Sequence, residues 1–295
     1  MSATLSPERE HLSLRTIDPY TRRRKQRSRF VRGLLLAAMV VAVIPLFLIL
    51  IEVVRRGWPA MGWEFLTQVQ PSGRTPGGGY VHGIIGTFYM VGFATLISVP
   101  VGILAAIYLV EYGRGPLTGI IRFFTDVMTG VPSVFVGLFI YALLVRQIGF
   151  GALVGGLGLS VMMLPIIVRS SEEMLRLVPE DQRAASAGLG ARKWQTIMKV
   201  VLPTAAPGLT TGAMLAVARA AGETAVLLLT ALGSLQVVNQ FQGQPIASIT
   251  LLVYRGARQP FAEGQQRAWA GALFLMVMVL LLTLSARYIS SRSRR

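Results

Sequence analysis

The sequence predicts an all-α membrane protein with six transmembrane helices. Three observations support this fold class. Of the 295 residues, 53% are hydrophobic, the chain holds several uncharged apolar stretches of about 20 residues, and its basic residues gather in the segments between them. A soluble domain of this length would expose far too much apolar surface.

The N-terminal segment, residues 1–32, is polar and contains a basic run from Arg22 to Arg32. We expect a disordered tail that anchors the topology. It does not match a cleavable signal peptide, because a long polar segment precedes the basic run and no small-residue cleavage site follows it. The first span covers residues 33–51. In the following loop, Trp58 and Trp63 suit the membrane interface, and residues 71–79 form a flexible segment.

The second predicted span covers residues 83–110, and a short interfacial helix over residues 117–126 precedes a third span over residues 127–145. Pro132 interrupts this third span. A proline frees a backbone carbonyl that lipid cannot satisfy, so this face should lie against protein or water. Pro132 and Ser133 are therefore candidates for a gate, although they could simply shape the helix.

Three further spans complete the bundle. The fourth, residues 147–168, is rich in glycine, and the fifth, residues 204–232, carries Gly208 and Gly212 at a spacing that permits close helix approach. A mostly polar loop over residues 233–267 follows, in which the apolar residues 246–253 suit an interfacial position. The sixth span covers residues 268–285, and a basic tail over residues 287–295 ends the chain.

Positive charge sets the predicted orientation. With the N-terminus inside, 21 of the 29 Lys and Arg residues fall in cytoplasmic segments and seven in external ones. This asymmetry predicts a multi-pass membrane protein with both termini in the cytoplasm. Residues 169–203 then form a cytoplasmic loop.

That loop has the pattern of two short helices. Pro179 suits a helix start, and Glu180 and Asp181 complement the dipole at its N-terminus. Residues 188–190 (GLG) permit a turn. A second helix, ended by Pro203, carries an apolar stripe at i, i+3, i+4 and i+7, formed by Trp194, Ile197, Met198 and Val201. Such a pair suits insertion between the bundle and a soluble partner. An amphipathic loop resting on lipid headgroups is the alternative.

Several stretches of the chain resemble a known family. Residues 178–203 are similar to the cytoplasmic coupling loop, or EAA motif, of binding-protein-dependent ABC importer permeases, with its glycine at Gly190. More narrowly, residues 130–133 (GVPS), 164–179, 193–197 (KWQTI) and 219–233 resemble the phosphate-specific permeases of the PstA type. The likeness extends from about residue 82 to residue 286, and it implies a type I, MetI-like permease fold over residues 82–286, with residues 33–81 contributing the first helix and an external loop.

The resemblance also implies which residues couple the chain to an ATPase. They are Pro179, Glu180, Asp181, Arg183, Ala184, Ala185, Gly188, Gly190, Trp194, Leu202 and Pro203. One departure stands out, because the acidic residue usual in this motif is replaced by Ala184. Coupling would then depend on Glu180 or Asp181, or on the partner permease.

Two opposite charges interrupt the fifth span. Arg219 and Glu223 are four residues apart and would share one face of a continuous helix. An unpaired charge in hydrocarbon costs on the order of 3 kcal/mol, so we expect them to pair and to face the bundle interior. Arg219 would attract an oxyanion while Glu223 keeps binding weak, or the pair only orients the helix. Arg169, at the end of span four, has a role in the same pathway or in coupling, or it only extends its charge to the membrane surface.

The composition and the motifs of the sequence also argue against several classes of function. There is no cysteine, the two histidines are isolated, and the basic residues lack the aromatic interleaving of a nucleic-acid interface, so we expect no metal site, no catalytic site and no nucleic-acid partner. The chain also has no Walker A pattern, so ATP would be used by another subunit and no cofactor bound by this chain.

The resemblance implies an importer of inorganic phosphate that includes this chain and four kinds of partner: a second permease of the PstC type, ATPase subunits of the PstB type, an external phosphate-binding protein of the PstS type, and the bilayer. Guanidinium chemistry alone does not distinguish phosphate from other oxyanions, such as molybdate or sulfate, so these remain alternative substrates. A membrane signalling or scaffold subunit that reports phosphate status, and a proton-coupled carrier, are weaker alternatives.

Overall fold

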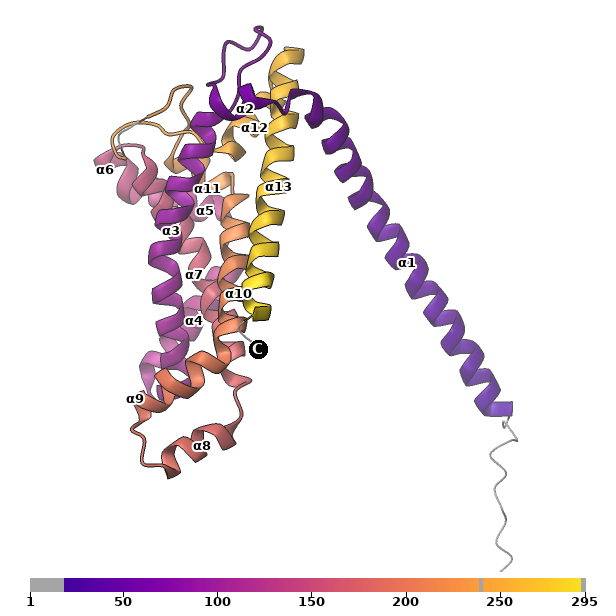
Figure 1. Ribbon diagram of the computed structural model, residues 1–295, viewed down its shortest axis with the longest axis vertical. Coiled ribbons are helices and arrows are strands. Elements are labelled where there is room, and N and C mark those ends of the chain that lie inside the picture. Colours follow the sequence, from indigo (N-terminus) through magenta and orange to yellow (C-terminus); the bar gives the residue numbers. More distant parts are fainter. Residues whose placement is uncertain (1–18, 239–240, 293–295) are drawn as a thin grey trace, which may run out of the picture. The chain divides into compact units, whose positions relative to one another are not determined.

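The computed structural model describes residues 19–238 and 241–292, and these residues are largely helical (Figure 1). Residues 1–52 form one unit and residues 53–295 a second. Helix α1 (Pro19–Gly57) contains the first predicted span. The expected tail is helical from Pro19 onward, because its Arg, Lys and Gln residues are good helix formers that continue into the apolar span. Residues 1–18 of the predicted tail lie outside the described residues.

Within the described residues, five helical stretches are long and apolar enough to cross a membrane, or six if one sharply bent pair counts as a span. They are Arg23–Ala60, Val81–Tyr112, Ala152–Arg176, Lys193–Ala221 and Ala262–Ser285, with the bent pair Pro116–Gly130 and Ser133–Ile148. The order of elements thus confirms the helical multi-pass architecture that the hydropathy predicts.

The core of the second unit is the contact between α3 (Val81–Ile107) and α7 (Ala152–Arg176). Small residues of α3, including Ala94, Ser98 and Gly102, are buried at four-residue intervals, so one face of the helix is flat enough for close approach. On α7, a Cβ added at Gly155 would lie 2.6 Å from the Met90 sulfur. The predicted close packing of the glycine-rich fourth span is therefore confirmed.

Helix α10 (Leu202–Ala221) packs on α7 and on α13 (Ala262–Arg292). Gly208 faces Met174, and Gly212 faces Ser170 at a distance that leaves no room for a Cβ. The small-residue spacing in span five therefore serves the predicted helix contact. The two helices run antiparallel, because successive turns of α10 meet earlier residues of α7.

The third predicted span is strongly bent. Helix α4 (Pro116–Gly130) and helix α5 (Ser133–Ile140) meet at 110°, and a π-helical turn, Tyr141–Val145, and α6 (Arg146–Ile148) follow. The expected interfacial helix is thus the first part of α4, which runs on to Gly130. The bend is sharp because Pro132 and the residue before it are both extended and cannot continue the helix.

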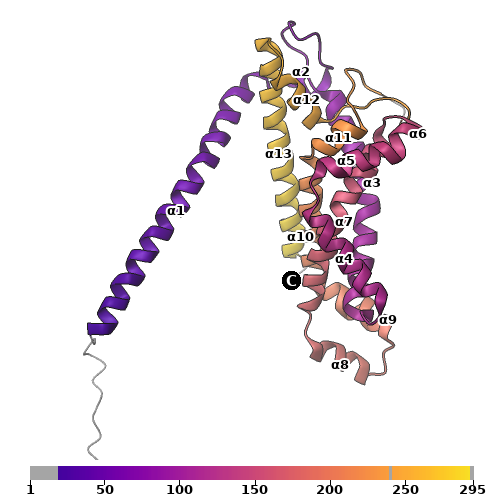
Figure 2. The ribbon, with the colours of Figure 1, turned by 180° about the vertical axis from the view of Figure 1, so that it is seen from behind.

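The loop after α7 contains α8 (Glu180–Gly188), α9 (Lys193–Thr196) and a π-helical turn, Ile197–Val201. We call α8 the first arm of the loop, and α9 with the π-helical turn the second arm. Contrary to the sequence-based expectation, Pro203 does not end the second arm, which runs directly into α10. The π-helical turn just before Pro203 already interrupts the regular hydrogen-bond ladder to which its missing N–H would contribute, so the continuous helix tolerates the proline. Both ribbon views place α8 and α9 at the end of the second unit opposite to α2 and α12 (Figures 1 and 2).

The opposite end is formed by a 3-10 turn, Trp58–Ala60, by α2 (Trp63–Thr67), by α11 (Ala225–Thr230) and by α12 (Ile249–Ala257). The apolar residues around 246–253 are buried rather than interfacial, because α12 packs against α13 and α3. Burial raises the pKa of the Tyr80 phenol well above its usual range, so the phenol stays protonated and donates to the Leu252 carbonyl oxygen at 3.3 Å.

Arg267 holds the loop that the sequence predicts to be flexible. Its side chain is only 3% exposed, and its two terminal nitrogens donate to the backbone carbonyl oxygens of Thr75 (2.6 Å), Gly77 (3.0 Å) and Ser72 (3.2 Å). The residues that should move freely are therefore bound at three points by one guanidinium.

Candidate functional site

Arg219 lies on the exposed face of α10, in the last turn of the helix. Exposed residues recur along this face as Thr204, Thr211, Leu215 and Arg219, whereas Ala216 and Ala220 on the other side belong to the buried core. From Leu202, Arg219 lies about 26 Å along the helix at 1.5 Å per residue. The guanidinium is therefore deep in the apolar part of the chain and directed away from the core of its own subunit.

Glu223 does not pair with Arg219. Helix α10 ends at Ala221, and the chain is not helical again until Ala225, so the two residues are not one turn apart on a continuous helix. Among the described residues Arg219 makes no ion pair, and the Glu223 carboxylate instead accepts from the Ala225 backbone N–H at 3.1 Å. The predicted pair is thus wrong, because span five is interrupted at residues 222–224.

A buried hydroxyl fixes this interruption. Thr250, in α12, donates to the backbone carbonyl oxygen of Glu223 at 2.9 Å. That carbonyl faces no continuing helix, so the hydroxyl supplies a hydrogen bond that the helix break would otherwise leave unmade. A contact between residues 27 positions apart therefore satisfies the backbone just after α10 ends.

The two gate candidates lie near the same break. Pro132 is the residue before α5, and Ser133 is its first residue. Helix α5 packs on α11, and Gly137, one turn further along, lies against Ala225 and Val226. The structure therefore brings the bend between α4 and α5 close to the segment that carries Glu223.

Arg169 forms a second charged site, between α7 and α4. Its guanidinium donates to the Asp126 carboxylate at 2.5 Å, and both side chains are more than half exposed. Next to it, Glu172 accepts from Arg122 of α4 at 3.1 Å and from Arg176 at 2.6 Å. These charges line a pocket of about 270 Å³, formed by Leu109, Arg122, Thr125, Asp126, Arg169, Glu172, Glu173 and Arg176.

The structure does not bring Arg169 and Arg219 together. Ser170 faces Gly212, so Arg169 lies near the level of Gly212 on the neighbouring helix. Arg219 is seven residues further along α10, which separates the two arginines by about 10 Å along the bundle. The two guanidinium groups are thus staggered in depth, with Arg169 nearer to the α8 end.

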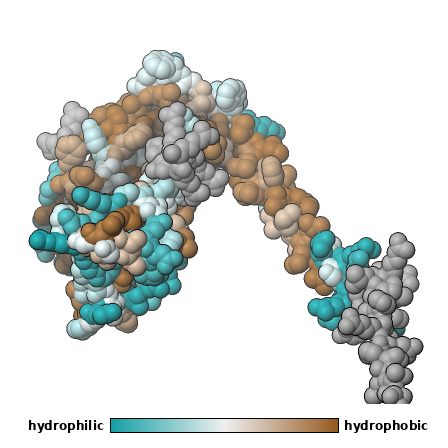
Figure 3. Space-filling view, turned by 60° about the horizontal axis from the view of Figure 1, so that its bottom comes forward, coloured by the Kyte–Doolittle hydropathy of each residue, from teal (hydrophilic) through white to brown (hydrophobic). Residues whose placement is uncertain are grey.

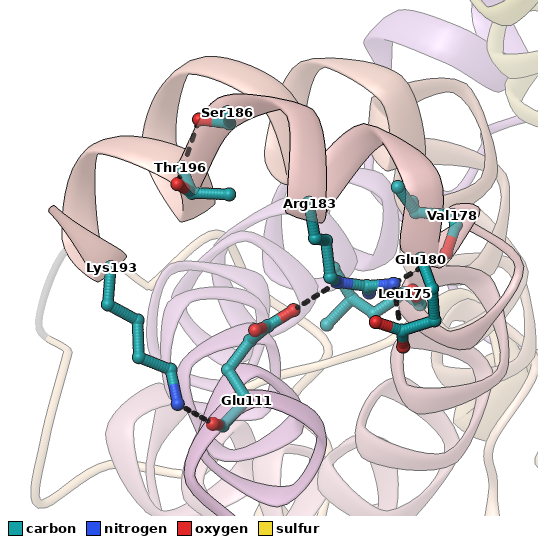
Figure 4. Close-up of polar contacts among 8 residues, drawn as sticks. All are labelled: Glu111, Leu175, Val178, Glu180, Arg183, Ser186, Lys193 and Thr196. Carbon is teal, nitrogen blue, oxygen red and sulfur yellow. Dashed lines mark hydrogen bonds and ion pairs between the residues drawn. The ribbon is translucent and has the colours of Figure 1, made fainter. Parts of the chain in front are cut away.

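Arg183 fastens α8 to the bundle (Figure 4). Its Nε donates to the Glu111 carboxylate at 3.1 Å, across a sequence separation of 72 residues. Glu111 belongs to a π-helical turn, Tyr108–Tyr112, which continues α3. At the other end of the loop, the Lys193 ammonium donates to the Glu111 backbone carbonyl and lies 4.3 Å from the centre of the Tyr112 ring.

The predicted apolar stripe of the second arm is divided between two environments. Ile197 and Val201 are buried beneath the loop, whereas Trp194 is 54% exposed and Met198 is 58% exposed. Leu189, in the turn, is 90% exposed. Three large apolar side chains of the loop, Leu189, Trp194 and Met198, are thus accessible at its surface. Figure 3 shows how hydrophilic side chains dominate the end of the molecule that is turned toward the viewer.

Most of the remaining residues of the predicted coupling set are exposed, whereas Leu202 packs against the buried cluster beneath the loop. Pro179 precedes α8, and Glu180 and Asp181 occupy its first turn as the sequence predicts. Ala184 and Ala185 are exposed, so the replacement of the usual acidic residue alters the surface and not the packing. Gly190 adopts φ +80°, a conformation that explains why glycine occupies the turn.

Sequence reasoning missed Glu111, Asp126 and Thr250, which hold the predicted residues in place. Each comes from a distant part of the chain. One signal was available for Glu111, because it is the first charged residue after a long apolar span, on the side where the loop is basic. No comparable signal marks Thr250.

The fold and these two charged sites define a multi-pass permease subunit, in which a surface loop is attached to the ends of membrane helices. A family model described as "Binding-protein-dependent transport system inner membrane component" matches residues 98–295. The chain belongs to this family of importer permeases.

Curated relatives are similar over most of the chain. The "Phosphate transport system permease protein PstA 1" of Mycobacterium tuberculosis (strain ATCC 25618 / H37Rv) is 39% identical over 94% of this chain and 92% of its own length. The "Phosphate transport system permease protein PstA" of Haemophilus influenzae is 38% identical over 90% of this chain and 94% of its own length.

Solved structures support the fold. A bacterial alginate ABC transporter in complex with a pentasaccharide-bound periplasmic protein matches with a TM-score of 0.66 at 16% identity, covering 90% of this chain and 96% of that chain. An inward-facing MetNI methionine ABC transporter matches with a TM-score of 0.59 at 20% identity, over 73% and 94% of the two chains.

Proposed function

We propose that this chain is the PstA-type permease subunit of an ATP-driven importer of inorganic phosphate in the bacterial inner membrane. It forms one half of the translocation pathway, and a homologous permease of the PstC type forms the other. The names and the close similarity of the PstA relatives support phosphate as the substrate.

The main support for a translocation pathway along α10 is the position of Arg219. It lies in the apolar part of α10, on an exposed face, and makes no ion pair among the described residues. An isolated charge facing lipid would be costly, so this face is expected to border a water-filled space or the second permease. A guanidinium there offers a planar set of donors that suits a tetrahedral oxyanion.

Glu223 and Arg169 have supporting roles in this proposal. The carboxylate of Glu223, four residues after Arg219 in the sequence, reduces the local positive potential so that the anion is not trapped. Arg169, about 10 Å nearer to the α8 end, offers a second transient contact and is itself neutralised by Asp126. The bend at Pro132 and Ser133 lies beside the Glu223 segment and serves as the gate.

The energy of ATP hydrolysis reaches this chain through the loop at residues 169–203. ATPase subunits of the PstB type bind its exposed side, where the small residues Ala184 and Ala185 and the apolar Leu189 and Trp194 are accessible. The loop is therefore cytoplasmic, both termini are cytoplasmic, and the α2 end faces an external phosphate-binding protein of the PstS type. The ATPase subunits bind and hydrolyse ATP. Closure of these subunits around ATP moves the loop, so that the pathway opens alternately to each side of the membrane.

The test is phosphate uptake by the complete importer in proteoliposomes, with the second permease, the ATPase and the binding protein present. Arg219→Gln should lower uptake at least about tenfold, the loss expected when one charge-assisted contact of ~1.4 kcal/mol is removed. Arg258→Gln is the matched control, because Arg258 is exposed at the end of α12. Normal uptake by the Arg219 variant would contradict the pathway.

Competition experiments in the same proteoliposomes identify the transported anion. Sulfate and molybdate should compete only weakly with labelled phosphate. Strong competition by either anion, together with its ATP-dependent uptake, would assign the importer to that oxyanion.

A further inference from the structure

Helix α8 is held to the rest of the protein almost entirely by polar contacts. None of its nine residues, all of them described, is buried. Its tertiary side-chain hydrogen bonds come from Arg183 and from Ser186, whose hydroxyl lies 2.9 Å from the Thr196 hydroxyl. A helix without a buried face has no apolar packing that would carry a displacement into the bundle. Apart from the backbone connections at its two ends, any force on α8 must therefore pass through these few contacts.

Arg183 has the geometry of a junction. Besides Glu111, it contacts two backbone carbonyl oxygens at the end of α7, through Nη1 to Val178 at 2.5 Å and through Nη2 to Leu175 at 2.9 Å. Figure 4 shows the guanidinium between Glu111 and these carbonyls. The planar fork of five donors allows one side chain to reach three acceptors in different directions, which an ammonium group cannot do with fixed geometry.

The Arg183–Glu111 ion pair is largely buried and lies beside a cluster of apolar side chains. The Arg183 side chain is 15% exposed and the Glu111 side chain 9% exposed. Leu175 and Val178, whose carbonyls Arg183 binds, have buried side chains in a cluster with Ala106 of α3 and Val201 of the second arm. The contact with Glu180, at 3.4 Å, is with a carboxylate that is 89% exposed and adds little.

Glu111 receives both arms of the loop. Its carboxylate accepts from Arg183 of the first arm, and its backbone carbonyl accepts from Lys193 of the second arm. Glu111 itself lies in the π-helical turn that ends the α3 stretch, and such turns are frequent at functional positions. One residue at the end of a membrane helix thus connects to the helices on both sides of the Gly190 turn.

We propose that the Arg183–Glu111 ion pair is the joint through which movement of α8 reaches the membrane helices, with both residues acting as positioning residues. When α8 is displaced, Arg183 moves the ends of α3 and α7 together, while Lys193 keeps the second arm and α10 in step. This proposal rests on the proposed function, because it assumes that an ATPase docks on α8.

The first experiment measures coupling in the reconstituted importer, as phosphate imported per ATP hydrolysed. Glu111→Gln and Arg183→Gln should each lower this ratio about tenfold, as expected from losing a charge-assisted hydrogen bond, while the ATPase still co-purifies. The double variant should be no worse than the single ones, because residues that act as a pair are not additive. Lys199→Gln, which removes an exposed charge from the same loop, should keep the ratio of the unmodified protein. Independent, additive losses would overturn the proposal.

The second experiment does not depend on which anion is transported. The chain has no cysteine, so spin labels at Gln182→Cys on α8 and Leu104→Cys on α3 report one distance in the assembled complex. With the joint intact, this distance should stay the same with and without a non-hydrolysable ATP analogue, because the two helices move together. In Glu111→Gln it should shift or broaden when the analogue binds. An unchanged, narrow distance in that variant would refute the joint, whereas absence of phosphate uptake by the unmodified importer would refute only the proposed function.

Discussion

The guanidinium of Arg169 and the carboxylate of Asp126 lie 2.5 Å apart and join α7 to α4. Both side chains are more than half exposed, so the pair contributes at most ~1 kcal/mol to stability. Its importance therefore lies in the charge of Arg169. In the proposed pathway, the carboxylate neutralises an arginine that would otherwise hold the anion.

Asp126→Asn should accordingly leave the melting temperature of the complex nearly unchanged and alter its kinetics. With Arg169 no longer neutralised, phosphate should bind more tightly and leave more slowly, so KM and kcat for uptake should both fall. Arg169→Gln should instead lower kcat/KM. If Asp126→Asn transports with unaltered KM and kcat, the ion pair has no influence on the pathway.

Thr250→Val should disturb the helix break that precedes Glu223. The variant loses the hydroxyl that donates to the Glu223 carbonyl and leaves that acceptor unsatisfied, at a cost of ~1–3 kcal/mol. We expect a lower melting temperature and reduced uptake. Thr250→Ser keeps the donor and should recover both measurements. Unaltered stability and uptake in Thr250→Val would show that the hydroxyl is not required.

Gly190 and Gly188 provide a matched pair in the loop. A Cβ at either position would meet no atom within 4 Å, but only Gly190 has a positive φ, of 80°. Gly190→Ala should therefore strain the turn by ~1–2 kcal/mol and reduce uptake, whereas Gly188→Ala, at the end of α8, should be tolerated. Trypsin cleavage at Arg192 and Lys193 should be faster in the first variant only. Identical cleavage rates would contradict a role for the backbone conformation.

Arg267→Lys should release the loop at residues 72–77. Lysine keeps the charge but cannot reach three carbonyl oxygens at once, so we expect a loss of about 1–3 kcal/mol and faster trypsin cleavage after Arg74. Arg258→Lys, at an exposed position, should leave cleavage at Arg74 as it is. A protected Arg74 in the Arg267 variant would mean that other contacts hold the loop.

The sequence predicts most of the helices, because apolar stretches and small-residue spacing are local properties. It places Gly208 and Gly212 correctly in a helix contact. It fails where a distant residue decides the outcome, as at residues 222–224. The stretch from Thr204 to Leu232 is uniformly suited to a span apart from its charges, and the break is held by Thr250 of a helix that the sequence assigned to the interface.

The candidate site was predictable in a similar way. Arg219 and Arg169 stand out as charges within or beside apolar stretches, and a proline-led pair of helices marks the loop. Their partners could not be identified, because Asp126 is 43 residues from Arg169 and Glu111 is 72 residues from Arg183. Such contacts depend on how α4 and α3 pack on α7, and periodicity does not record this.

The absence of buried side chains in α8 affects how its sequence can change. Core packing restricts residue size and shape, but here it restricts almost nothing beyond Arg183 and Ser186. In the proposed complex, the other positions of the helix are free to vary with the ATPase that covers them. Substitutions such as Ala184 should therefore be accompanied by changes in that protein's contact surface, and coordinated variation between the two chains would show which residues meet.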